Sequence, residues 1–246
     1  MNYQWNWAVF LEETPEGGVH YWELMVSGLG WTLAVSTLAW VMALSLGVVI
    51  GTVRTTRSRG LVLLGDAWVE VFRNIPLLVQ MFLWYFVLPE LIPPLKRWIV
   101  RVDPTWAQFV AAVSCLGLFT SARIAEQVRA GIESLPRGQR EAASALGLTT
   151  LQAYRHVLLP MALRIVIPPL TSEAMNLIKN SSIALTIGLA ELTFRAREMG
   201  EYTFNFFEAF TAATIIYVVI AMSVNRAMAW LERRAAVPGF MGRGAK

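Results

Sequence analysis

The residues most able to take part in chemistry are charged side chains within or beside long apolar stretches of this 246-residue chain. Glu173 and Lys179 lie in one such stretch, and Arg123 follows another. Charged groups in apolar surroundings are rarely tolerated unless they face a cavity or one another. Because an arginine can hold a carboxylate through two parallel hydrogen bonds, Arg123 either helps to select an anionic solute or marks the end of its apolar stretch.

Lys179 and several uncharged polar residues also have two interpretations each. Lys179 could bind a carboxylate of a solute, or it could pair with Glu126 and stabilise the fold. Amide and hydroxyl side chains among apolar residues usually hydrogen-bond between helices, although some could line a route for a polar solute. These uncharged polar residues are Gln80, Asn176, Asn180, Ser181 and Ser182.

Several kinds of chemistry are excluded by composition. One cysteine, Cys115, cannot form an internal disulfide, and the two histidines, His20 and His156, are too far apart to have the spacing of metal ligands. Each of the three lysines follows a residue other than glycine, so the chain has no P-loop and cannot bind ATP in that way. No pairing of a nucleophile with a base is apparent, so we expect neither a metal, nor a cofactor, nor a catalytic site.

The elements that must position these residues are long apolar helices. Hydrophobic residues make up 56% of the chain, and no charge occurs between Glu23 and Arg54. A helix needs about 20 apolar residues to cross a bilayer. The sequence therefore predicts an all-α membrane protein with five spans, at about 26–52, 74–95, 104–122, 162–188 and 209–230.

The distribution of basic residues predicts the orientation of these spans. If the N-terminus is outside, 15 lysines and arginines fall in the inner segments and 5 in the outer ones. Since inner loops carry the excess of basic residues, we expect the N-terminus outside and the C-terminus in the cytosol. The expected parts are an outer segment 1–23, which does not resemble a signal peptide, a membrane domain 24–232 and a cytosolic tail 233–246.

One polar segment, about 136–160, has the pattern of two short helices. Pro136 would begin the first, Glu141 would lie in its early turns, and Gly147 would end it in the left-handed conformation. Thr149 and Gln152 have the spacing of a capping box, which would open a second helix running to Pro160. The small side chains of Ala142 and Ala143 would let a partner approach, and an ordinary amphipathic surface helix is the alternative.

The same segment resembles the EAA signature of ABC importer permeases. The matching residues are Glu141-Ala142-Ala143, Gly147 and 157–160, where Val157 replaces the usual Ile. Further stretches, 72–80, 126–132 and 176–182, resemble the polar amino-acid permeases of this family. The opening Trp5-Asn6-Trp7, the run 134–139 and the overall length are most similar to permease subunits of glutamate/aspartate importers. The resemblance covers about 24–232.

The resemblance implies a type I ABC importer permease fold in the inner membrane of a bacterium, with an amino acid as substrate. Its implied partners are two ABC ATPase subunits, a second homologous permease subunit and a periplasmic amino-acid-binding protein, with no nucleic acid. The ATPase-coupling residues would be Glu141, Ala142, Ala143, Gly147 and Pro160. The candidates for the substrate path are Arg123, Glu126, Gln80, Lys179, Asn180 and Ser181.

Two features bear on the substrate. The family usually has an aromatic residue where this chain has Arg123. A positively charged residue at this position is consistent with an acidic amino acid as the substrate. Lys179 belongs to a motif shared with importers of cationic substrates, so its structural role is favoured. One alternative is an ABC importer of the same type that carries a neutral or cationic amino acid. The other is an autonomous channel or secondary transporter, which would give no function to the 141–160 segment.

Overall fold

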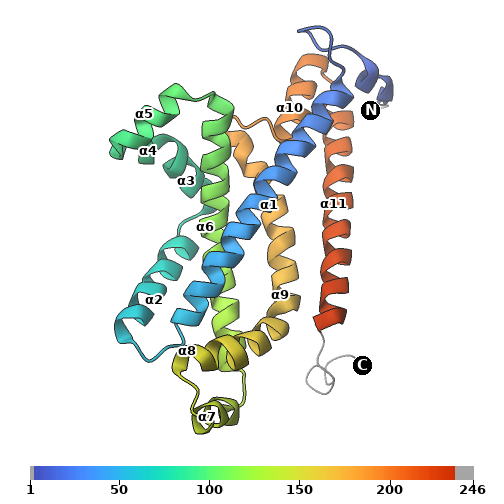
Figure 1. Cartoon of the computed structure of the whole chain (residues 1–246). Coiled ribbons are helices and arrows are strands. Elements are labelled where there is room, and N and C mark those ends of the chain that lie inside the picture. The colour runs from blue at the N-terminus through green and yellow to red at the C-terminus, as the bar shows by residue number, and fades with distance from the viewer. Residues whose placement is uncertain (1–2, 236–246) are drawn as a thin grey trace. The chain divides into compact units, whose positions relative to one another are not determined.

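The computed structural model of the chain describes residues 3–235, and these residues form helices joined by short segments (Figure 1). Within 3–235 there is no strand, and the β pairing is one isolated bridge between Glu13 and His20. The all-helical fold class predicted from the sequence is therefore confirmed. Most of the predicted tail 233–246 lies outside the described residues, and the predicted orientation of the termini stays a prediction.

Four helices of the described chain are long and apolar enough to cross a membrane. They are α1 (Tyr21–Val53), α6 (Pro104–Glu133), the composite helix Thr150–Ile187 and α11 (Phe206–Ala235). These correspond to the first, third, fourth and fifth predicted spans. All four begin earlier than or close to the predicted start, because polar residues at the ends of apolar stretches continue the helices.

The second predicted span, at about 74–95, is a broken pair of helices. α2 (Arg59–Asn74) and the helical stretch Leu77–Leu91 are long enough to cross a membrane only together, and the chain bends between them at Pro76. Pro76 has no N–H and restricts the residue before it to extended conformations, which ends α2. The stretch Leu77–Leu91 comprises α3 (Leu77–Phe82), the π-helix η2 (Leu83–Val87) and α4 (Leu88–Leu91). Counted as one span, the pair gives the fifth.

Three segments beside the predicted spans, for which the sequence predicted no helix of their own, contain helices in the structure. Residues 54–73 contain α2, residues 90–103 contain α5 (Pro93–Arg101), and residues 189–208 contain α10 (Leu192–Thr203). α2 and α5 are strongly amphipathic. Charged residues interrupt their apolar runs, so neither helix has the long apolar stretch by which the other helices were predicted. A short 3-10 helix, η1 (Trp7–Leu11), also occurs in the N-terminal segment.

The sequence predicted that the second helix of the polar segment ends at Pro160, but in the structure this helix continues past it. α8 (Thr150–Ala153) continues through the π-helix η3 (Tyr154–Leu158) into α9 (Leu159–Asn180) and then the 3-10 helix η4 (Ser181–Ile187). At the widened turn, the Leu159 N–H donates to the carbonyl oxygen of Tyr154, five residues earlier. Pro160 follows this turn directly, where the ordinary helical ladder is already interrupted, so its missing N–H does not stop the helix.

The chain divides into two compact units, and each long helix contributes part of its length to both. The first comprises the chain up to Trp40, Pro76–Gly117 and Asn176–Met222. Its apolar cores are built around side chains such as Met81, Leu116 and Leu177, and around Val9, Met25 and Leu192. The second unit comprises Val41–Ile75, Leu118–Met175 and the chain from Ser223 onward.

In the first unit, Glu191 fixes the start of α10. Its carboxylate is fully buried and accepts hydrogen bonds from the backbone N–H groups of Thr193 and Phe194 at 3.0 and 2.8 Å and from the Tyr217 hydroxyl at 2.9 Å. These bonds satisfy donors that a helix N-terminus leaves open. Burial nevertheless raises the pKa of the Glu191 carboxyl above its usual value.

In the second unit, α1 and α6 pack closely because α1 carries glycines four residues apart. A Cβ atom added at Gly51 would lie 2.6 Å from the Ala125 carbonyl oxygen, and one at Gly47 would lie 2.6 Å from the Ile124 side chain. Small residues at this spacing let two membrane helices approach each other backbone to backbone. The contact holds α6, which carries Arg123 and Glu126, against the end of α1.

Candidate functional site

The first helix of the polar segment has the boundaries that the sequence predicted. α7 (Arg137–Ala145) follows Pro136 and is ended by Gly147, whose φ of +75° is left-handed. The N–H of Gly147 donates to the Ser144 carbonyl oxygen at 3.0 Å, and the N–H of Leu148 donates to that of Ala143 at 3.1 Å. This pair of bonds is the Schellman motif. Glu141 lies in the middle of α7, not in its early turns as expected. The helix dipole therefore stabilises the negative charge of Glu141 only weakly.

The predicted capping box is also present and connects α7 to the composite helix. The Thr149 hydroxyl oxygen accepts a hydrogen bond from the N–H of Gln152 at 3.3 Å, and the Gln152 side chain accepts one from the N–H of Thr149 at 2.9 Å. Both ends of the connection at 146–149 are thus fixed by local hydrogen bonds. The end of α7 and the start of the composite helix are therefore both defined by local hydrogen bonds.

Several residues of the EAA pattern line open grooves beside this element. Ala142, Ala143 and Pro160 line one of about 510 Å³, while Glu141 and three arginines line another of about 610 Å³. Two leucines beside α7 are unusually exposed: Leu146 to 80% and Leu151 to 76%. Exposed apolar side chains next to grooves with charged residues are typical of a surface that binds another protein.

Tyr154 connects the segment to the turn that follows α1, a contact that the sequence analysis missed. Its hydroxyl donates to the Thr55 carbonyl oxygen at 2.7 Å, and the Thr55 hydroxyl lies 3.0 Å from it. From α7, the Arg140 guanidinium donates to the same hydroxyl at 3.4 Å and lies 5.9 Å from the ring centroid. The 99 positions between Thr55 and Tyr154 explain why no local sequence signal predicted this contact.

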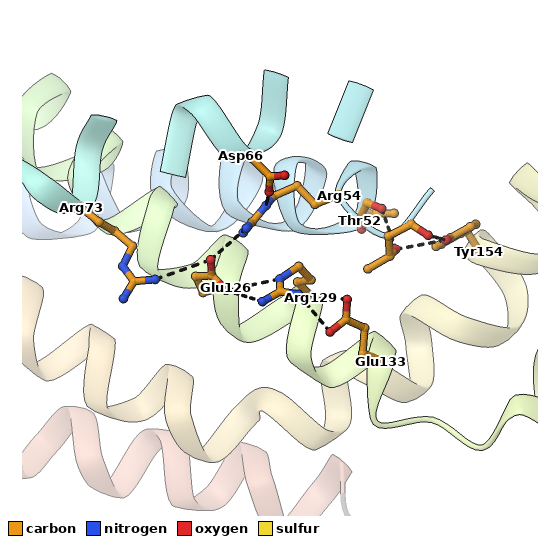
Figure 2. Close-up of polar contacts among 9 residues, drawn as sticks. Thr52, Arg54, Asp66, Arg73, Glu126, Arg129, Glu133 and Tyr154 are labelled. Atoms are coloured by element: carbon orange, nitrogen blue, oxygen red, sulfur yellow. Dashed lines mark hydrogen bonds and ion pairs between the residues drawn. The ribbon is translucent and has the colours of Figure 1, made fainter. Parts of the chain in front are cut away.

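A network of ion pairs surrounds Glu126 (Figure 2). Its carboxylate contacts Arg54 at 2.9 Å, Arg129 at 3.2 Å and Arg73 at 3.5 Å, and Arg54 also contacts Asp66 at 2.7 Å. The Arg54 side chain is only 7% exposed. These pairs join the end of α1, α2 and α6, so Glu126 has arginine partners in place of the Lys179 that the sequence analysis considered.

Arg123 and Glu173 form a second, bidentate ion pair between α6 and α9. Arg123 Nε donates to Glu173 Oε2 at 2.6 Å and Arg123 Nη2 donates to Oε1 at 3.0 Å, while the Gln127 side chain adds a bond at 3.1 Å. The Glu173 side chain is 6% exposed and that of Arg123 is 42% exposed. A buried carboxylate therefore holds a guanidinium that remains accessible. Glu173 was not among the candidate site residues, although its charge within an apolar stretch indicated that it needed a partner.

The other substrate-path candidates lie in the first unit. Gln80 is buried on α3, whereas Lys179 is exposed at the end of α9 and Asn180 is half-buried beside it. The Ser181 hydroxyl is buried and donates to the carbonyl oxygen of Ile178 at 2.7 Å. This bond uses the only proton of the hydroxyl, so Ser181 would contact a solute only as an acceptor.

The fold and the ordered helix–turn–helix together define a class of protein, the permeases of type I ABC importers. The chain belongs to the family described as "Binding-protein-dependent transport system inner membrane component", whose model matches residues 43–237. Its structure is similar to that of an amino acid ABC transporter solved with histidines, with a TM-score of 0.73, 33% identity, and coverage of 87% of this chain and 95% of the other. The inward-facing methionine transporter MetNI, at 22% identity and a TM-score of 0.72, shares the fold.

Relatives define the subgroup. The chain is 48% identical to the glutamate/aspartate import permease protein GltJ of Escherichia coli K12, over 98% of this chain and 99% of the relative. It is 39% identical to the probable glutamine permease GlnM of Bacillus subtilis, over 77% and 82% of the two chains. It is 33% identical to the arginine permease ArtQ of the same organism, over 78% and 83%. The chain is thus a permease subunit of an amino-acid ABC importer.

Proposed function

We propose that this permease moves acidic amino acids, glutamate and aspartate, into the cell. The observation that carries this proposal is the 48% identity to the glutamate/aspartate permease of E. coli, which extends over 98% of the chain. Arg123 supports it, because its accessible guanidinium is the type of group that binds a carboxylate. The glutamine and arginine permeases match less of the chain and at lower identity.

The machine that we propose contains two ATPase subunits, a second permease and a periplasmic binding protein. The N-terminus of this chain faces the periplasm and its C-terminus the cytosol. α7 docks on the ATPase through Glu141, Ala142 and Ala143, with Gly147 and Pro160 fixing the shape of the docking segment. When ATP binding closes the ATPase pair, the coupling helices move together and the solute path opens outward. Hydrolysis, which occurs on the partner subunits, resets it inward.

In this proposal, Arg123 has to exchange partners when it binds a solute. The Glu173 carboxylate occupies Nε and Nη2 of Arg123, so a substrate carboxylate either takes the remaining N–H groups or displaces Glu173. The cost of leaving Glu173 buried without its partner weakens binding and keeps release possible. Glu126, Gln80, Lys179, Asn180 and Ser181 remain candidates for the rest of the path.

A neutral or cationic amino acid is the second candidate substrate, because permeases for glutamine and arginine are among the relatives. The Arg123–Glu173 pair is neutral as a whole, so it does not by itself repel such solutes. An autonomous channel or secondary transporter would instead carry solute without any ATPase.

The experiment is purification of the tagged chain from its native membrane in mild detergent, followed by identification of the proteins that accompany it. We expect an ATPase and a second, similar permease, and stimulation of the ATPase by glutamate- or aspartate-loaded binding protein. A chain that purifies alone and transports solute after reconstitution would contradict the proposal. Stimulation by glutamine or arginine alone would retain the importer and reject the acidic substrate.

A further inference from the structure

Thr55 and Arg54 are neighbours in the turn after α1, and each is held by a different part of the second unit. Arg54 contacts Asp66 on α2 and Glu126 on α6, at 2.7 and 2.9 Å (Figure 2). Thr55 contacts Tyr154 on η3 through both its carbonyl oxygen and its hydroxyl. The turn is therefore fixed on one side by an ion-pair network and on the other by a single tyrosine.

Tyr154 is well suited to connect this turn with α7. Its side chain is buried, and its hydroxyl lies within hydrogen-bond distance of both Thr55 and Arg140 of α7. The residue also begins the π-helix η3, and such widened turns occur frequently at functional sites. Two links join α7 to Tyr154: the Arg140 side chain, and the short connection at 146–149, which local hydrogen bonds keep ordered.

From these contacts we propose that Tyr154 transmits the movement of α7 to the turn after α1, through its hydroxyl bond to Thr55. Tyr154 is thus a positioning residue, which touches neither nucleotide nor solute. The inference rests on the proposed function, since it requires α7 to be moved by an ATPase. Arg54 then passes the displacement to α2 and α6, because its guanidinium is shared by Asp66 and Glu126.

The test uses the complete transporter, reconstituted with its ATPase and binding protein, and the variant Tyr154→Phe. Phenylalanine keeps the ring and its packing beside Arg140 and removes only the hydroxyl. We expect the variant to assemble, with unchanged ATPase activity in the absence of binding protein. Uptake per ATP hydrolysed should fall about twofold to thirtyfold, the range expected for loss of one coupling contact.

Tyr202→Phe is the matched control, because it removes the same atom from an exposed tyrosine on α10. It should leave the ratio of uptake to hydrolysis unchanged. Thr55→Val, which removes one of the two contacts with Tyr154, should lower the ratio in the same direction but less. It carries the test if Tyr154→Phe does not accumulate in the membrane.

Three outcomes separate the possibilities. A fall in the ratio for Tyr154→Phe, with assembly intact, supports the transmission role. An unchanged ratio, or loss of the ATPase from the purified complex, would overturn it, since the latter would make Tyr154 part of the docking surface. A wild-type complex that shows no stimulation of ATP hydrolysis by loaded binding protein would contradict the proposed function itself.

Discussion

Arg123 on α6 holds the buried Glu173 of α9 through two hydrogen bonds, from Nε at 2.6 Å and from Nη2 at 3.0 Å. The pair joins a guanidinium that is still accessible to a carboxylate that is almost completely covered. Charge-assisted bidentate pairs of this kind have a defined geometry as well as a favourable energy. In the proposed function a substrate carboxylate also binds Arg123, so Glu173 and the substrate would compete for the same group.

This competition predicts opposite shifts for two substitutions. Arg123→Tyr removes the guanidinium and should raise the concentration of glutamate for half-maximal uptake roughly tenfold, the magnitude of one lost charged hydrogen bond. Glu173→Gln weakens the competitor and should lower that concentration. Concentration series of glutamate uptake in cells that depend on this importer give both values. Unchanged values for both variants would mean that the ion pair only stabilises the fold.

Glu141→Lys should detach the ATPase or prevent it from driving transport. Glu141 is exposed on α7, and reversal of its charge places like charges against any arginine of the partner, which costs several kcal/mol. We expect more than about tenfold less ATPase to accompany the purified variant. Glu16→Lys makes the same charge change at an exposed residue of the N-terminal segment and serves as the control. Normal uptake by Glu141→Lys would count against α7 as the coupling helix.

Gly147→Ala should loosen the end of α7 without any steric clash. An added Cβ would meet no atom within 4 Å, so the cost comes only from the left-handed backbone, about 1 kcal/mol. Hydrogen exchange at Leu148, whose N–H closes the Schellman motif, should become faster. Gly138→Ala, at a helical position of α7 with equally open surroundings, should not accelerate it. Equal rates in both variants would exclude a role for the Gly147 conformation.

The stability of the first unit should depend on pH through Glu191. Burial raises the pKa of this carboxyl in the folded state, so the folded chain binds more protons than the unfolded one. The stabilising contribution of Glu191 to the folded state is therefore fully present below the usual glutamate pKa. It is lost as the pH rises through the raised pKa of Glu191. Melting temperatures in detergent should fall across that interval, and Glu191→Gln should flatten the change. A rise of melting temperature with pH that depends on Glu191 would show that its pKa is lowered.

Local sequence signals predicted the local structure of this protein well. The left-handed Gly147 and the capping box of Thr149 and Gln152 depend on residues within a few positions of one another, so their spacing identified them. Apolar runs identified the long helices for the same reason. α2 was missed because its apolar face is interrupted by charges, and an apolar run is then a poor guide.

The partners of charged residues could not be predicted in the same way. Arg123 and Glu173 are 50 positions apart, and Arg54 and Glu126 are further apart still, so only the packing of the helices decides which charges meet. The sequence indicated that Glu173 needed a partner, but several arginines were available, and for Glu126 it suggested only Lys179. For Pro160, the sequence predicted the end of a helix, and the π-helix that accommodates it leaves no simple pattern.

The most direct test of the account is uptake of labelled glutamate by vesicles that contain the purified complex and enclosed ATP, with loaded binding protein outside. We predict accumulation that requires ATP, that aspartate inhibits and that Glu141→Lys abolishes. Accumulation without ATP, or equal accumulation by the Glu141→Lys complex, would contradict the claim that this chain couples an ATPase to the import of an acidic amino acid.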